Sequence, residues 1–325
     1  MLHDGPSKPR AAPRVSEVEA SVSAPRPHRP ELHSSIAQID LSHLGFRIEG
    51  QSIAGVETWL RIPQWSLGID VGRSPDHIVR CRHLALTHAH MDHAGGLAQY
   101  LAMRRLYGLG TSTVYAPEAA CADLTTLVDA WQRLHGHDFD WRLVPMQPGE
   151  EAELGGGRFL RAFAVQHVVP ALGYAVFERP RKLRPEYVGQ PGEVLRELAA
   201  RGVVTTTQSD RVLLGVSGDS LVSVLETSRD LQQAEVALCE VTFLDGRRSV
   251  ADAHVGAHIH LDELVERSEL LTCRHFVPYH ISQIYSVREA QELLQTRLPP
   301  SLAERTHPLL PYDRARPPSG TQLAT

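Results

Sequence analysis

Apolar and polar positions along this chain follow two different periods, which together predict a mixed α/β protein. Apolar runs bounded by Gly, Pro or polar residues predict strands, at residues 46–62, 66–72, 83–87, 113–117, 158–166, 173–177, 211–219, 235–243 and 274–280. Helical spacing predicts helices, at residues 95–107, 118–134, 191–202, 261–271 and 287–298. The early strands form hairpins, and strands then alternate with helices.

The two ends of the chain have a different composition. Residues 1–34 are rich in Pro, Arg and Ser and predict a disordered tail. This tail contains no apolar stretch typical of a secretory signal, and its acidic residues argue against an organelle transit peptide. Residues 35–312 are expected to form one catalytic domain, and residues 313–325 a loose C-terminal tail.

Charge and composition exclude several classes of protein. The 325 residues carry a formal charge of −5 and a pI near 6.4, so the chain has no overall basic field, and any binding of nucleic acid must rest on local basic patches. No apolar run approaches the ~18 residues of a membrane span. The four cysteines form no CxxC pair and predict reduced thiols in a cytoplasmic protein.

The stretch THAHMDHAGG, at residues 87–96, contains three histidines and an aspartate within six positions, immediately after a predicted buried strand. In this HxHxDH pattern, His88 and His90 suit one metal ion, while Asp92 and His93 suit a second ion beside it. The alternative is a histidine-rich surface loop, and the preceding strand argues against it.

Three more candidate ligands follow predicted strands. His167, Asp219 and His280 would each, if taken alone, be explained as an ordinary core or surface residue. Their positions at strand ends, in a chain that also contains the HxHxDH pattern, reverse that preference, and Asp219 suits the role of bridging two metal ions. The first ion would be held by His88, His90, His167 and Asp219, and the second by Asp92, His93, His280 and Asp219. Imidazole and carboxylate without thiolate favour Zn²⁺, with Mn²⁺ or Fe²⁺ as alternatives. Asp70 is expected to orient the histidine-rich turn.

The order of these motifs resembles the metallo-β-lactamase superfamily. Further stretches resemble ribonuclease Z more closely, and the short plant-type form most of all: IDVGRSP, KLRPEYVGQPG, SGD, EVTFLD and AHIHLDEL. This resemblance spans about residues 48–312. It implies a four-layer αβ/βα fold and hydrolysis of the phosphodiester 3′ of the discriminator nucleotide in precursor tRNA. It also implies a homodimer.

The resemblance assigns catalytic roles to three residues. Asp92 would align or deprotonate the attacking water while holding its metal ion. His258 matches the histidine that serves the leaving 3′-oxygen, and Glu240 would orient His258. His260 competes for this role, but its position at the start of a predicted helix is explained by capping.

A short basic segment at about residues 178–205 matches the family's substrate-binding arm. Its cationic side chains suit RNA phosphates, namely Arg179, Arg181, Lys182 and Arg184. The alternative is a solvated loop. Arg104 and Arg105 either line an approach path for the substrate or face solvent.

Two other functions remain open. The same metal set would serve a phosphodiesterase acting on small or cyclic phosphodiesters. A non-catalytic binding protein on the same scaffold is disfavoured, because every predicted metal ligand is present. No cysteine occupies position 219, which argues against a β-lactamase.

Overall fold

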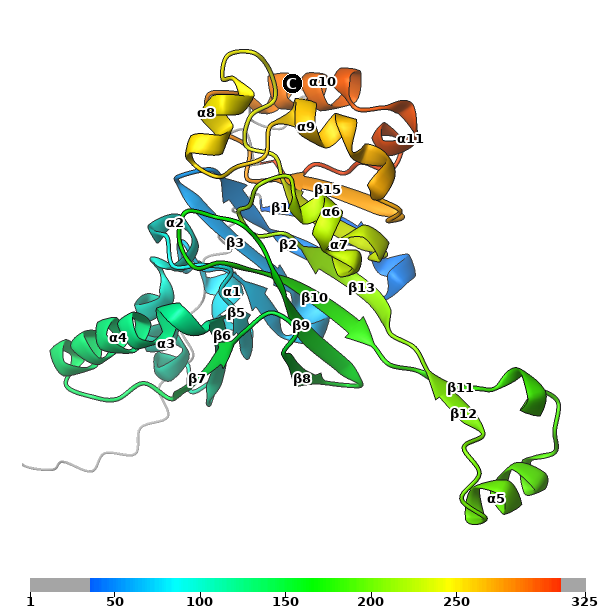
Figure 1. The fold of residues 1–325 in the computed structure, drawn as a ribbon. Helices are drawn as coiled ribbons and strands as arrows, with labels where there is room; N and C mark the ends of the chain where they lie inside the picture. Colours follow the sequence, from blue (N-terminus) through cyan, green and yellow to red (C-terminus); the bar gives the residue numbers. More distant parts are fainter. Residues whose placement is uncertain (1–35, 311–325) are drawn as a thin grey trace, which may run out of the picture. The chain divides into compact units, whose positions relative to one another are not determined.

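The computed structural model describes residues 36–310, so the predicted tails at 1–34 and 313–325 lie outside the described residues. Two β-sheets form the centre of the described part (Figure 1). The first sheet contains seven strands in chain order: β1 (Ala37–Leu41), β2 (Phe46–Ile53), β3 (Glu57–Ile62), β4 (Leu67–Ile69), β5 (His83–Ala85), β6 (Ser112–Pro117) and β7 (Trp141–Met146). Its first four strands are antiparallel, and β4 to β7 are parallel.

The second sheet contains six strands in the order β15-β14-β13-β10-β9-β8. Their bounds are β8 (Glu151–Gly155), β9 (Arg158–Ala164), β10 (Leu172–Glu178), β13 (Arg211–Val216), β14 (Val236–Glu240) and β15 (His275–Tyr279). Strands β13, β14 and β15 are parallel, so their C-terminal ends meet at one edge of the sheet.

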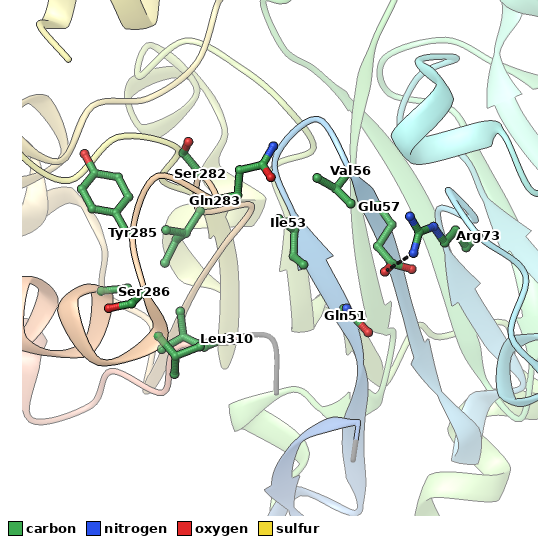
Figure 2. Close-up of a pocket in the computed structure, with 13 residues that line it drawn as sticks. Gln51, Ile53, Val56, Glu57, Arg73, Ser282, Gln283, Tyr285, Ser286 and Leu310 are labelled. Atoms are coloured by element: carbon green, nitrogen blue, oxygen red, sulfur yellow. Dashed lines mark hydrogen bonds and ion pairs between the residues drawn. The ribbon is translucent and has the colours of Figure 1, made fainter. Parts of the chain in front are cut away.

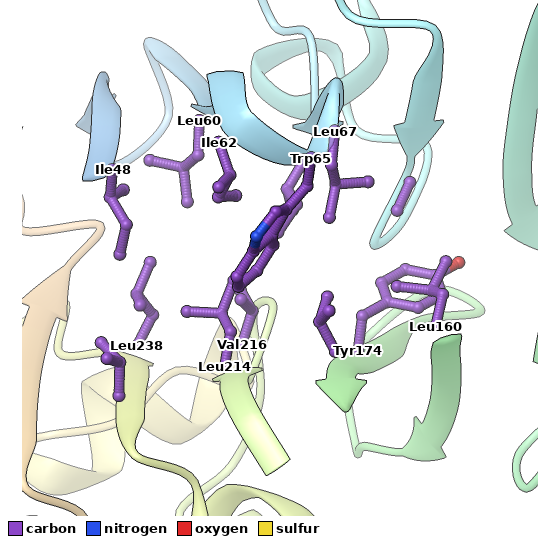
Figure 3. Packing of buried hydrophobic residues seen from close by; sticks show 14 of the residues in the cluster. Ile48, Leu60, Ile62, Trp65, Leu67, Leu160, Tyr174, Leu214, Val216 and Leu238 are labelled. Carbon is purple, nitrogen blue, oxygen red and sulfur yellow. The ribbon is translucent and has the colours of Figure 1, made fainter. Parts of the chain in front are cut away.

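A hydrophobic core fills the space between the two sheets. Trp65, Leu67 and Ile48 of the first sheet and its connections face Leu214 and Leu238 of the second (Figure 3). All five side chains are buried, and removing such apolar surface from water is the main stabilising contribution to a fold of this kind. This core sets the separation of the two sheets and therefore the relative positions of the loops that follow their strands.

Helices cover the outer face of each sheet. The first sheet packs against α1 (Asp76–Val79), α3 (Leu97–Leu106) and α4 (Cys121–His135). The second packs against α6 (Val224–Thr227), α7 (Arg229–Gln233), α9 (Leu261–Glu266), α10 (Val287–Arg297) and α11 (Pro300–Ala303). The order of layers is therefore helix, sheet, sheet, helix, and the four-layer αβ/βα fold expected from the sequence is confirmed.

Several elements differ from the sequence prediction. Strand β7 was not predicted, because it is a half-exposed edge strand that contains Pro145. The helix predicted at 118–134 begins only at Cys121, after a 3₁₀ turn, and the helix predicted at 261–271 ends at Glu266. Helix α8 (Val250–Val255) was also missed, although the capping box of Ser249 and Asp252 is a recognisable start signal.

The segment between β10 and β13 forms a separate arm. It contains a two-stranded sheet, formed by β11 (Arg181–Leu183) and β12 (Thr206–Gln208), and the helix α5 (Gly192–Ala200). Figure 1 shows this arm extending away from the two sheets. Among residues 36–310, no helix has the length and apolar character needed to span a lipid bilayer.

Candidate metal centre

The predicted ligands meet at one edge of the two sheets. His88 and His90 follow β5, while Asp92 and His93 lie in the short helix α2 (Met91–Ala94). From the second sheet come His167 after β9, Asp219 after β13 and His280 after β15. Residues up to 192 positions apart thus converge because the strands before them end at the same edge.

Histidine nitrogens form the first half of the centre. His88 Nε2 and His90 Nδ1 lie 3.0 Å apart, and His90 Nδ1 lies 3.4 Å from His167 Nε2. The three residues form one group whose donor atoms lie within 4.8 Å of one another. Burial and the neighbouring His93 lower the pKa of His88 to about 2, so its ring is neutral and can bind a metal ion.

The second half of the candidate centre lies directly beside the first. Asp92 Oδ2 is 3.6 Å from His93 Nε2 and 3.5 Å from His280 Nε2, and these two nitrogens are 3.2 Å apart. Burial opposes ionisation of Asp92, but its interactions with His280 and His93 outweigh burial and lower its pKa. The carboxylate is therefore ionised, as a ligand or a proton acceptor requires.

Asp219 lies between the two halves. Its Oδ2 is 3.8 Å from His88 Nε2, 3.4 Å from His93 Nε2 and 3.3 Å from His280 Nε2. The carboxylate is buried, yet its Oδ1 has no hydrogen-bond partner. A buried carboxylate oxygen without a partner is costly unless a cation or water satisfies it. The grouping of these buried histidines and carboxylates fits a metal site, and the Asp219 carboxylate is close to residues of both halves.

Asp70 contacts the histidine-rich turn without being one of the predicted metal ligands. Its carboxylate accepts hydrogen bonds from the Thr87 amide (2.7 Å) and from His93 Nδ1 (2.8 Å). The backbone here adopts unusual conformations: Asp70, Ala257 and His280 are three of the four non-glycine residues in 36–310 with positive φ. Such strain persists only where the surroundings hold it, and it often marks functional sites.

Glu240 and His258 form a pair next to the metal ligands. His258 Nδ1 lies 3.1 Å from Glu240 Oε1 and 3.9 Å from Asp219 Oδ2. Glu240 is buried and fixed by hydrogen bonds from the amides of Ser220 (3.1 Å) and Ile259 (3.2 Å). Burial opposes protonation of His258, but Glu240 outweighs it and raises the pKa of His258 to about 9.

His260 points elsewhere. Its Nδ1 accepts the amide of Asp262 at the start of α9, and its Nε2 lies 3.0 Å from the carbonyl of Arg248. Both nitrogens are thus occupied by backbone groups, in agreement with the capping role expected from sequence. His258 instead lies within 4.8 Å of Asp219 and His280 in a fourth group of potential ligands.

Sequence reasoning missed two groups at the site. The Gly55 amide, in the turn between β2 and β3, donates to Asp92 Oδ2 at 2.8 Å. The Thr242 hydroxyl donates to Glu240 Oε2 at 2.9 Å and lies 3.2 Å from His280 Nδ1. Thr242 belongs to the EVTFLD stretch and was within reach of motif analysis, whereas a backbone amide 37 positions from its acceptor leaves no trace in the sequence.

A pocket of about 400 Å³ lies behind that turn, between the β2–β3 hairpin and the segment after His280 (Figure 2). The pocket has apolar walls from Ile53, Val56 and Leu310, and contains the Glu57–Arg73 ion pair at 3.2 Å. Its lining includes none of the predicted metal ligands. The predicted metal ligands therefore lie outside this pocket.

The predicted RNA-contacting residues do not share one environment. Arg181, Lys182 and Arg184 are exposed on or beside β11. Arg179 is instead held at the base of the arm by Asp210 and Glu151. Arg104 differs from both alternatives considered for it: it is 3% exposed and donates to the carbonyls of Val79 (2.8 Å) and Leu109 (3.0 Å), so it stabilises the fold.

Comparison with known proteins identifies related chains. A model of the β-lactamase superfamily domain matches residues 66–281. The chain is 32% identical to tRNase Z TRZ1 of Arabidopsis thaliana over 82% of its own length and 95% of that protein. It is 37% identical to nuclear ribonuclease Z of Triticum aestivum over 50% of its own length and 92% of that protein.

Solved structures share the fold at low sequence identity. The metallo-β-lactamase fold protein YhfI of Bacillus subtilis superposes with a TM-score of 0.58 and 10% identity, over 82% of this chain and 97% of that one. The short form of human tRNase Z superposes with a TM-score of 0.50 and 14% identity, over 72% and 92%.

Proposed function

Because this chain belongs to the tRNase Z family of the β-lactamase superfamily, we propose that it is a metal-dependent endoribonuclease acting on precursor tRNA. The proposed reaction hydrolyses the phosphodiester 3′ of the discriminator nucleotide and leaves a 3′-hydroxyl. The observation that carries this proposal is that His258, paired with Glu240, lies beside the proposed metal ligands, with its Nδ1 3.9 Å from Asp219 Oδ2. The substrate class follows from the relatives, whose names describe tRNase Z and ribonuclease Z.

The metal ions have a defined place in this proposal. His88, His90 and His167 would hold one ion, Asp92, His93 and His280 the other, and Asp219 both. When bound, two divalent cations, with Zn²⁺ favoured by the donor set, supply a water of lowered pKa and neutralise charge on the scissile phosphate.

Protein side chains carry the proton transfers. Asp92, held in its ionised form and oriented by the Gly55 amide, accepts the proton of the attacking water. His258 Nδ1 is directed to Glu240, which leaves its Nε2–H free to protonate the leaving 3′-oxygen. The buried Glu240 keeps this orientation because backbone amides fix its carboxylate.

RNA binding is assigned to the arm and to Arg181, Lys182 and Arg184. These cations are exposed on one short stretch, and the Arg184 guanidinium lies 3.9 Å from the carboxylate of Glu186. Exposed lysine and arginine side chains suit phosphate contacts whose strength falls with salt. We further expect the protein to be cytoplasmic and to form a homodimer. Light scattering of the purified protein would test the homodimer.

The decisive experiment is cleavage of an end-labelled precursor tRNA by purified protein with Zn²⁺ or Mn²⁺. We expect one cut after the discriminator nucleotide, abolished by Asp92→Ala and weakened in a salt-dependent way by the Arg181→Ala/Lys182→Ala/Arg184→Ala triple variant. Arg133→Ala, an exposed cation on α4, is the matched control. An intact tRNA together with turnover of a chromogenic phosphodiester would instead assign the protein to the phosphodiesterases.

A further inference from the structure

The arm between β10 and β13 contains no buried residue: every side chain from 181 to 211 is exposed or half-buried. An element without a core cannot fix its own direction relative to the sheets. Its direction therefore depends on the two positions where the chain leaves and re-enters the second sheet, which are the residues next to β10 and β13.

Arg179 and Asp210 occupy these two positions and are paired in a bidentate manner. Arg179 Nε lies 2.7 Å from Asp210 Oδ1, and Arg179 Nη2 lies 3.1 Å from Asp210 Oδ2. Such fork-to-fork pairing fixes orientation as well as distance. It joins the outgoing and the returning segment of the arm directly.

The pair is anchored to the body through two more residues. Glu151 on β8 accepts from Arg179 Nη2 (3.0 Å) and from Arg161 Nη2 (2.7 Å). Arg161 on β9 also bonds Asp210 and reaches Asp230 of α7 at 3.2 Å. We name Arg179, Asp210, Glu151 and Arg161 the arm clamp.

Aromatic rings hold the clamp against the sheet. The guanidinium of Arg161 lies 4.2 Å from the ring centre of Phe177, and that of Arg179 lies 4.9 Å from the same ring. Hydrogen bonds from Arg179 and Arg161 outweigh partial burial and lower the pKa of Asp210, so the carboxylate is charged. Isolated surface ion pairs contribute little to stability, but a stacked, bidentate network of this kind is the recognised exception.

We propose that Arg179 is a positioning residue: with Asp210 it sets the direction of the arm and thereby places Arg181, Lys182 and Arg184 relative to the metal centre. This proposal rests on the proposed RNA-cleaving function and replaces the assignment of Arg179 as an RNA contact. The guanidinium of Arg179 already donates to two carboxylates, which leaves it poorly available to a phosphate.

A role of Arg179 as an RNA contact and a role as a positioning residue predict opposite effects of Asp210→Ala on substrate binding. If Arg179 contacts RNA, removing its acidic neighbour frees the cation and takes a negative charge from the interface, so substrate binding stays equal or tightens. If Arg179 holds the arm, Asp210→Ala weakens substrate binding as much as Arg179→Ala does. The loss in the double variant is then smaller than the sum of the two single losses, because both single changes remove the shared Arg179–Asp210 pair.

The test compares Arg179→Ala, Asp210→Ala and the double variant, with Arg133→Ala as a control for loss of one surface cation. We expect KM for precursor tRNA to rise by about tenfold in all three clamp variants. Turnover at saturation and hydrolysis of a small chromogenic phosphodiester should stay at the parent level. Tighter binding by Asp210→Ala, or additive losses in the double variant, would overturn the proposal.

A second readout needs no RNA. Spin labels on Gln190→Cys in the arm and His137→Cys after α4, in a Cys121→Ser background, report the distance from arm to body. We expect the distance distribution to broaden in Arg179→Ala and in Asp210→Ala, and a distribution as narrow as the parent's would refute the clamp. If the parent protein leaves precursor tRNA intact, the proposed function fails, while this measurement still decides whether the clamp holds the arm.

Discussion

Asp70 Oδ2 accepts a hydrogen bond from His93 Nδ1 at 2.8 Å, although 23 positions separate the two residues. The bond fixes the His93 ring so that its Nε2 faces Asp92 (3.6 Å) and Asp219 (3.4 Å). Asp70 is itself held by the amide of Thr87, the residue before the histidine-rich turn. One buried carboxylate thus sets both the start of the turn and the direction of a ligand within it.

Asp70→Asn should therefore weaken metal binding without removing any ligand. Loss of a contact behind a ligand typically costs about 10- to 100-fold in metal affinity. Competition with a chelator, followed by measurement of bound metal, tests this prediction. The control is Asp138→Asn on an exposed loop, and equal metal retention in both variants would contradict the role of Asp70.

His258→Gln should slow cleavage of precursor tRNA by about 10²- to 10⁴-fold, the usual range for loss of a general acid. A phosphodiester with a nitrophenolate leaving group needs no proton on departure, so its hydrolysis should change far less. His260→Ala gives the contrast: loss of the α9 cap should cost about 1 kcal/mol of stability, with the rate ratio between the two substrates unchanged. Equal losses on both substrates would exclude His258 as the proton donor.

Removal of metal should destabilise the protein as well as inactivate it. The buried Asp219 carboxylate has an oxygen without a partner, which bound cations would satisfy. A metal ion at 100 times its dissociation constant adds about 2.7 kcal/mol, so chelation should lower the melting temperature by roughly 5 °C or more. His254→Ala, outside the ligand sets, should keep this shift, whereas Asp219→Ala should lose it.

Glu49 makes stability depend on pH. It is 8% exposed and accepts from Arg47 Nε at 2.5 Å and Arg61 Nε at 2.6 Å. Burial would raise its pKa, but these hydrogen bonds outweigh burial and lower it. A lowered folded-state pKa means that the ionised group stabilises the fold above its unfolded pKa of about 4.3, and that this contribution disappears as the pH falls through the folded pKa. Glu49→Gln should thus lower the free energy of unfolding near neutral pH, and the difference from the parent should shrink in acid, as urea unfolding would measure.

The meeting of the proposed metal ligands at one edge could be predicted from sequence, because His88, His167, Asp219 and His280 come shortly after strands whose apolar patterns are local. His258 could be separated from His260 because helix capping is also local. The functions of Arg104 and Arg179 could not be read in this way. Their partners, such as Val79 for the first and Glu151 for the second, lie 25 and 28 positions away and are brought close only by tertiary packing.

The arm contains no buried residue. The strands that lead into and out of it, β10 and β13, pair directly with each other, from Tyr174 with Val216 to Glu178 with Arg211. Insertions into such a surface excursion change the free energy of unfolding only slightly, by about 0.6 kcal/mol for each doubling of length. Changes in the arm beyond the clamp residues are therefore expected to leave the folding of the two sheets and the proposed metal ligands at their edge largely unaffected. If the arm binds the substrate as proposed, substrate choice and bond cleavage are encoded in different segments of the chain and can diverge independently.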